Sequence, residues 1–167
     1  IIILGVYKRM TSKTKKEIFA EKMYSDILTG LIYPLVGNKT TYMNDLNKTG
    51  IKLLGIKFKG VYPADKIPIL NDLKPYCILN LDNSGEVGSH WIALGKIEGL
   101  NSCVVYDSFA RKNTQIIPNL LKSGNGRIID SDLSDREQEI NETDCGARSL
   151  SFLIVLDKFG YEIAKLI

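Results

Sequence analysis

Cys145 stands at the junction between a polar, acidic stretch and a nearly continuous apolar run in INETDCGARSLSFLIVLDKFG (141–160). Thr143 or Asp144 can cap a helix that begins there, which places the thiol in the first helical turn. The free N–H groups and the dipole at a helix start favour an anion, so they favour the nucleophilic thiolate over the thiol. The alternative is a buried and inert cysteine, the usual environment of this residue type.

A thiolate nucleophile normally needs a base, and His90 is the single histidine of the 167-residue sequence. It opens the apolar segment HWIALGKI after the polar, glycine-containing NSGEVGS. Strand ends beside such loops commonly carry functional side chains. The alternative is a structural histidine. If the chemistry is nucleophilic, an imidazole base must be His90.

An imidazole base needs an orienting partner, and a predicted hairpin of HWIALGKI with SCVVYDSF supplies Asp107. With a two-residue turn at Glu98–Gly99, His90 lies directly opposite Asp107 on the same face. A turn centred between Gly99 and Leu100 makes the pair diagonal but keeps the face, whereas a half-step slip puts the carboxylate on the other face. The alternative is a surface carboxylate at a strand end, although the apolar VVYDSF context favours a buried one with a partner.

These side chains must be positioned by helices at both ends of the chain and strands between them, a pattern that predicts an α+β fold. Apolar residues cover nearly the whole circumference of the helix expected from Cys145 to about Phe159, with Gly160 just past its end, so this helix is expected to be buried. Further helices are predicted over 12–31, capped by Ser12 or Thr14, and over 40–55. Another is predicted over 114–123, in which Pro118 must lie in the first turn or break the helix. Strands are predicted over 76–81, 90–97, 102–109 and 126–130, and 58–75 is expected to be an extended connection.

The composition, with 44% hydrophobic and 25% charged residues, is that of a single soluble globular domain. No apolar run is long enough for a membrane span, and IIILGVY (1–7), which we interpret as a short strand, lacks the basic segment of a signal peptide. Three widely spaced cysteines predict a reducing compartment rather than a disulfide framework. Cys77 and Cys103 are interpreted as core residues, and neither a metal site nor a cofactor is expected.

The charge is unevenly distributed. Residues 1–66 hold 12 basic and 5 acidic side chains, a net charge of +7, whereas 67–167 carry a net −4. The basic half is either a solvated face that keeps the protein soluble or a surface that binds a polyanion such as DNA.

The order His-Trp, then an acidic residue in YDSF, then Gln, then Cys-Gly resembles the adenain-like cysteine proteases. This group includes the maturation proteases of adenovirus, large DNA viruses and virophages, and the SUMO-deconjugating enzymes. GSHWIAL, VVYDSFAR and QEINETDCGARSL carry the resemblance, which covers about residues 55–160. The seven-residue step from Gln138 to Cys145 resembles the adenovirus enzyme, whereas Asp107 resembles the SUMO-type members. Residues 1–54 form a variable, helical N-terminal part with no recognised motif.

The resemblance implies a papain-like fold in rearranged order, His before Cys, with the central helix packed against a mixed sheet. It implies that His90 is general base and acid, that Asp107 orients it and that Cys145 is the nucleophile. Gln138 and the Cys145 backbone N–H would form the oxyanion hole, where each preorganised donor contributes on the order of 3 kcal/mol. Trp91 would line the substrate channel, and Gly146 would leave room for the substrate backbone.

The implied function is that of a viral maturation endopeptidase cutting capsid or core precursor proteins at Gly-Gly-X-like sites. It would act in the virion or the host cytoplasm, without a membrane anchor. Three alternatives stay open: a deconjugase for ubiquitin-like modifiers, an acetyltransferase that uses the same triad, and a binding module without activity. The first of these also acts after Gly-Gly, and the second normally needs cofactor-binding sequence that this chain does not show.

Overall fold

The computed structural model describes residues 13–86 and 88–167, so the strand predicted at 1–7 lies outside the described residues. The α-helices are α2 (Lys15–Ile27), α3 (Tyr33–Val36), α4 (Met43–Leu54), α5 (Asn113–Ile116), α6 (Cys145–Phe159) and α7 (Tyr161–Ala164). Single turns of other helix types are the π-helical η1 (Leu28–Ile32) and the 3-10 turns η2 (Gly55–Lys57) and η3 (Pro118–Lys122). The strands are β1 (Phe58–Tyr62), β2 (Tyr76–Asn80), β3 (Trp91–Lys96), β4 (Ser102–Tyr106) and β5 (Arg127–Asp130).

The strands form one five-stranded sheet in the order β1-β2-β3-β4-β5. The two inner pairings, β2 with β3 and β3 with β4, are antiparallel. The two outer pairings, β1 with β2 and β4 with β5, are parallel, so the sheet is mixed. The α+β class predicted from the sequence is therefore confirmed.

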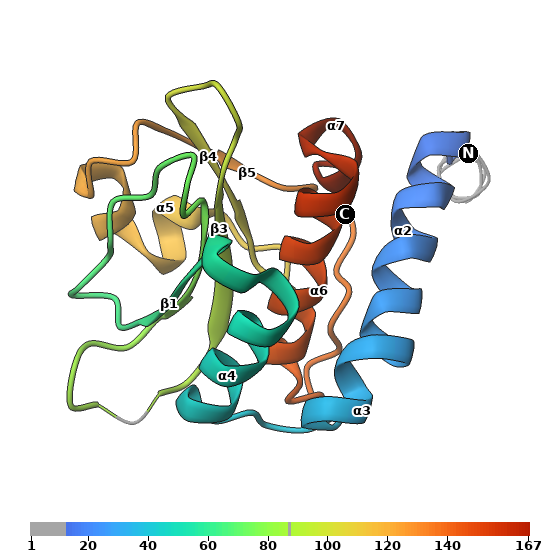
Figure 1. The fold of residues 1–167 in the computed structure, drawn as a ribbon, viewed down its shortest axis with the longest axis horizontal. Coiled ribbons are helices and arrows are strands. Elements are labelled where there is room, and N and C mark those ends of the chain that lie inside the picture. Colours follow the sequence, from blue (N-terminus) through green and yellow to red (C-terminus); the bar gives the residue numbers. More distant parts are fainter. Residues whose placement is uncertain (1–12, 87) are drawn as a thin grey trace, which may run out of the picture.

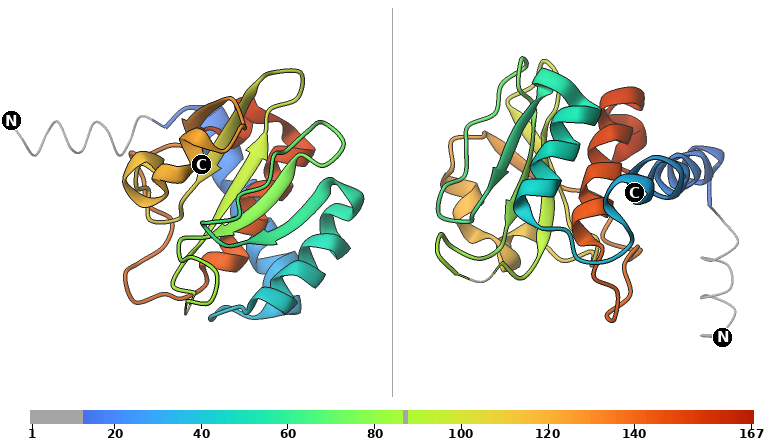
Figure 2. Two further views of the ribbon diagram at one scale, coloured as in Figure 1. Left: turned by 90° about the vertical axis from the view of Figure 1, so that its left-hand side faces the viewer. Right: turned by 60° about the horizontal axis from the view of Figure 1, so that its bottom comes forward.

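Helices and loops cover the sheet on both faces (Figure 1). α6 and α4 pack against one face, and α2 packs on the side of α6 that points away from the sheet. The opposite face is covered by η3 and by the long connection after β1 (Figure 2). α6 consequently lies between the sheet and α2, which makes it the central helix.

Strand side chains alternate between two apolar cores, as the period of a strand requires. The core on the α6 side takes Ile78, Ala93 and Val104, and the other core takes Leu79, Leu94 and Val105. Cys77 and Cys103 lie in the second core as free, buried thiols, which confirms their interpretation as core residues.

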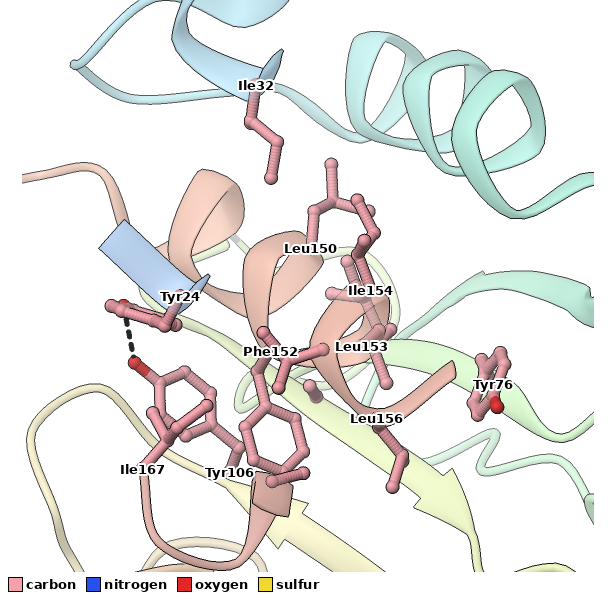
Figure 3. Close-up of a cluster of buried hydrophobic side chains, with 14 of the residues drawn as sticks. Tyr24, Ile32, Tyr76, Tyr106, Leu150, Phe152, Leu153, Ile154, Leu156 and Ile167 are labelled. Atoms are coloured by element: carbon pink, nitrogen blue, oxygen red, sulfur yellow. Dashed lines mark hydrogen bonds between the residues drawn. The ribbon is translucent and has the colours of Figure 1, made fainter. Parts of the chain in front are cut away.

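α6 is buried on nearly all sides, as its sequence predicts, from Cys145 through Leu156. Phe152 stacks on Tyr106 of β4 with ring centroids 4.6 Å apart. The Tyr106 hydroxyl also hydrogen-bonds the Tyr24 hydroxyl of α2 at 2.7 Å (Figure 3). Because Ser151 of α6 donates to the Tyr24 carbonyl at 2.7 Å, α2 is fixed to both the central helix and the sheet.

Several predicted boundaries are confirmed, and three elements were missed. Thr14 caps α2 by accepting from the Glu17 N–H at 3.1 Å, and Gly160 follows α6 with a positive φ of 81°. Pro118 opens η3 rather than lying inside a helix. β1 lies within the segment that was expected to be an extended connection. No element was predicted where α3 lies, between the helices predicted over 12–31 and 40–55, or where α7 follows Gly160.

No helix within the described part of the chain is both long and apolar enough to cross a membrane.

Candidate active site

Cys145 is the first residue of α6, and its side chain is nearly buried. Asp144 precedes it at the N-cap position but makes no capping hydrogen bond to the backbone, because its φ and ψ of −93° and 28° are not the extended values that capping needs. Its carboxylate instead accepts from the Tyr33 hydroxyl of α3 and, at 3.0 Å, from Arg148 Nε. The predicted position of the N-cap is right, and its predicted hydrogen bond is wrong.

The hairpin of β3 and β4 brings His90 and Asp107 together. Ala93 lies opposite Tyr106, and the Ile97 N–H donates to the Ser102 carbonyl at 3.0 Å, so the turn is centred between Gly99 and Leu100. This is the second of the two registers considered above, in which the pair is diagonal on one face.

His90 and Asp107 are joined directly within the buried interior. His90 Nε2 lies 2.7 Å from Asp107 Oδ1, and the exposed fractions of the two side chains are 8% and 2%. Because a carboxylate only accepts, Nε2 must carry the proton. That leaves Nδ1 as the nitrogen available to a thiol.

The thiol of Cys145 contacts the same strand. Its Sγ lies 3.5 Å from the Trp91 backbone N, which donates to it. Burial lowers the pKa of His90, but the neighbouring Asp107 carboxylate and Cys145 thiol raise it, and the net pKa lies above the ordinary value of 6.5. A raised pKa makes the imidazole a stronger base, which suits proton uptake from the thiol.

Asp107 is held by the turn that follows β4. Its Oδ1 also accepts from the Phe109 N–H at 3.1 Å, and its Oδ2 accepts from the N–H and the Nε of Arg111 at 3.2 and 2.7 Å. Burial alone would raise the pKa of this carboxyl, but its bonds to His90 and Arg111 lower it to about 2. Asp107 is therefore ionised at neutral pH and fixed in orientation.

Gln138 is fully buried, and both ends of its amide are fixed. Its Oε1 accepts from the Ser108 hydroxyl at 2.5 Å, and its Nε2 donates to the Glu142 carbonyl at 2.6 Å. The Gln138 backbone N–H donates to the Ser108 carbonyl at 3.0 Å. One Nε2 hydrogen remains for another acceptor, and Ser108, a residue that the sequence analysis missed, sets its direction.

Trp91 and Gly146 pack against each other next to Cys145. The indole Nε1 donates to the Thr41 carbonyl at 3.0 Å, so Trp91 joins β3 to the chain that precedes α4. A Cβ built on Gly146 would lie 3.2 Å from both Trp91 and Leu46. This close packing gives Gly146 a structural reason to be glycine, and contact of either residue with a substrate stays a prediction.

Trp91 also lines a pocket of about 490 Å³, which residues 40–43 and the polar loop after β2 complete. The site combines a buried thiol with a histidine bound to an ionised carboxylate, and Ser108, the residue after Asp107, holds the amide of Gln138. Across residues 13–86 and 88–167, no group of three or more His, Cys, Asp or Glu side chains is placed to hold a metal ion.

The sequence matches no known family model. A search of curated proteins likewise gives no match.

Proposed function

We propose that this protein is a cysteine protease in which Cys145 is the nucleophile, His90 the base and Asp107 the residue that orients His90. The observation that carries the proposal is the buried, hydrogen-bonded pair of His90 and Asp107, at 2.7 Å. The thiol at the start of the central helix accepts from the N–H of Trp91, the residue next to His90. A nucleophile, a base and an orienting group in one buried cluster is the arrangement that nucleophilic acyl transfer needs.

The proposed reaction follows from these positions. His90 Nδ1 takes the thiol proton, and Cys145 Sγ attacks the carbonyl carbon of a peptide bond. The resulting oxyanion accepts hydrogen bonds from the Cys145 N–H and from the free Nε2 hydrogen of Gln138. The imidazolium then protonates the departing amine, and a thioester remains. Water, deprotonated by His90, attacks the thioester and releases the carboxylic acid and the thiol.

The fold supports a finer proposal, that of a papain-like cysteine protease with its histidine before its cysteine. In this arrangement a buried helix carries the nucleophile against a sheet that carries the base. α6 and the hairpin of β3 and β4 have these roles here, and the resemblance of the His-Trp, YDSF and Cys-Gly segments to adenain-like proteases supports the same proposal.

By that resemblance, the substrates are viral capsid or core precursor proteins cleaved at Gly-Gly-X-like sites. Incubation with a candidate precursor, followed by mass spectrometry of the new termini, tests this proposal. SUMO and ubiquitin fusions in parallel reactions test the deconjugase alternative. Cleavage of the fusions alone would reassign the substrate and keep the chemistry.

The chemistry itself is tested with an alkylating reagent, because the chain has three free cysteines. At neutral pH we expect iodoacetamide to modify Cys145 faster than Cys77 or Cys103, which lie in the core as internal controls. The His90→Ala variant should lose this preference and, like Cys145→Ala, all peptide cleavage. Equal modification of all three thiols, or near-normal cleavage by either folded variant, would end the proposal.

A further inference from the structure

Arg111 contacts both residues that hold His90 in place, Asp107 and Phe109. Its Nε lies 2.7 Å from Asp107 Oδ2, on the oxygen that His90 does not use. Its guanidinium also lies 5.2 Å from the ring centroid of Phe109. Phe109 in turn stacks on the imidazole of His90, with ring centroids 4.9 Å apart and planes inclined by 29°.

One short turn makes this arrangement possible. The Ala110 N–H donates to the Asp107 carbonyl at 2.8 Å, which closes a tight turn. Ala110 has a φ of 55°, the one positive φ of a non-glycine residue within the described part of the chain. This backbone conformation is energetically unfavourable for an alanine. The turn brings the Phe109 N–H to one oxygen of the Asp107 carboxylate and Arg111 to the other.

We propose that Arg111 is a positioning residue of the candidate active site, which fixes His90 through Asp107 and Phe109 and opposes protonation of its imidazole. The catalytic consequence of this inference rests on the proposed function. Its structural and electrostatic parts do not. Arg111 is 42% exposed, so its role is not core packing. A planar guanidinium can pair with a carboxylate and stack on a ring simultaneously, which an ammonium cannot do equally well.

The sign of the electrostatic effect follows from the groups that face each other. Among the described residues, Asp107 and Cys145 are the titratable groups whose hydrogen bonds raise the pKa of His90. Arg111 shares Asp107 with His90, so it takes part of the negative charge that stabilises the imidazolium. Removal of the Arg111 charge should therefore raise the pKa of His90 further.

The single histidine permits a direct measurement, since its Cε1–H resonance in an NMR titration needs no assignment. The background is Cys145→Ala, which removes the neighbouring thiol. We expect Arg111→Gln to raise the His90 pKa by about half a unit, a modest shift because the guanidinium is partly solvated. Arg111→Lys keeps the charge and should shift the His90 pKa by less than about 0.2 unit.

Arg127→Gln is the matched control, since Arg127 is an exposed arginine on β5 that lies opposite Ser102, at the far end of β4 from Asp107. It should leave the titration unchanged. In the enzyme with Cys145 intact, both Arg111 variants should lower kcat about tenfold with KM within twofold, because the lysine loses the guanidinium geometry.

An unchanged titration in Arg111→Gln, or an equal shift in Arg127→Gln, would overturn the inference. If Arg111→Gln does not fold, the Arg111→Lys variant tests the inference instead. A wild-type kcat in Arg111→Lys would equally overturn the inference. A titration shift in a protein that cleaves no peptide would support the Arg111 inference and contradict the proposed function, so the two failures are distinguishable.

Discussion

Ser108→Ala tests whether the orientation of Gln138 matters for catalysis. Ser108 is fully buried, and its hydroxyl donates to Gln138 Oε1 at 2.5 Å. Its backbone carbonyl accepts from the N–H groups of Glu137 and Gln138 at 3.1 and 3.0 Å, and these bonds do not depend on the side chain. The substitution therefore removes one anchor of the Gln138 amide and leaves the backbone in place.

The substitution should change both the free energy of unfolding and kcat. Gln138 is 1% exposed, so its Oε1 would lose its partner in a dry environment, which costs about 1–3 kcal/mol of the free energy of unfolding. The amide would keep the bond from Nε2 to the Glu142 carbonyl at 2.6 Å but could turn about it. A fully lost oxyanion donor lowers kcat by about 10²–10³. A donor that is present but poorly aimed should lower kcat by about tenfold, with KM less affected.

The assay is steady-state cleavage of a peptide substrate, together with urea unfolding of the same preparations. Ser151→Ala is the control, since Ser151 is equally buried and its hydroxyl donates to the Tyr24 carbonyl at 2.7 Å, away from the site. It should lose less stability, because the Tyr24 carbonyl keeps the bond from the Leu28 N–H, and it should keep its kcat. The reasoning is refuted if both variants lose kcat equally, or if Ser108→Ala loses stability and no activity.

The other predictions concern Gln138, Asp107 and the basic half of the chain. Gln138→Ala should lower kcat by about 10²–10³ with a smaller effect on KM, and a loss confined to KM would assign Gln138 to substrate binding. Asp107→Asn should retain some activity, because Asp107 orients and does not react. The pKa of Asp107 is lowered from 3.8 to about 2, so its stabilisation of about 2 kcal/mol is present above pH 4 and lost as the pH falls through 2. Urea unfolding should show that loss in the wild type and not in Asp107→Asn. Residues 1–66, with a net charge of +7, should bind a labelled random DNA duplex at about 50 mM salt and release it near 200 mM in fluorescence anisotropy. Absence of binding at the lower salt would remove DNA as a partner, and cleavage rates with and without the duplex would distinguish an activator from a tether.

Most elements were predictable because local patterns determine them. The all-apolar run predicted the extent and burial of α6, and short apolar segments beside turn residues predicted β2, β3 and β4. β1 was missed because three prolines dominate the segment after Lys57, although Pro63 only ends the strand. The parallel pairing of β1 with β2 joins segments separated by a long connection, and such pairing leaves no local signal.

The principal residues of the candidate site were predictable from the sequence, but the residues that hold them in position were not. A single histidine and a cysteine at a helix start could be read directly, and the hairpin limited the choice of carboxylate to Asp107. The roles of Ser108 and Arg111 depend on where one tight turn directs its side chains, which spacing alone does not determine. The tyrosine that binds the carboxylate of Asp144 comes from α3, over a hundred residues earlier in the chain.

The central place of α6 has a consequence for the order of folding. Its contacts with Tyr24, Tyr33 and β3 join residues far apart in sequence, and long-range contacts slow folding. During synthesis, at roughly 5–20 residues per second, the earlier helices and the sheet leave the ribosome before residue 145 does. These elements therefore emerge before the helix that completes their hydrophobic core. The thiol is the last member of the candidate site to arrive, so a nascent chain has no assembled site until its sheet and N-terminal helices are ready to receive α6.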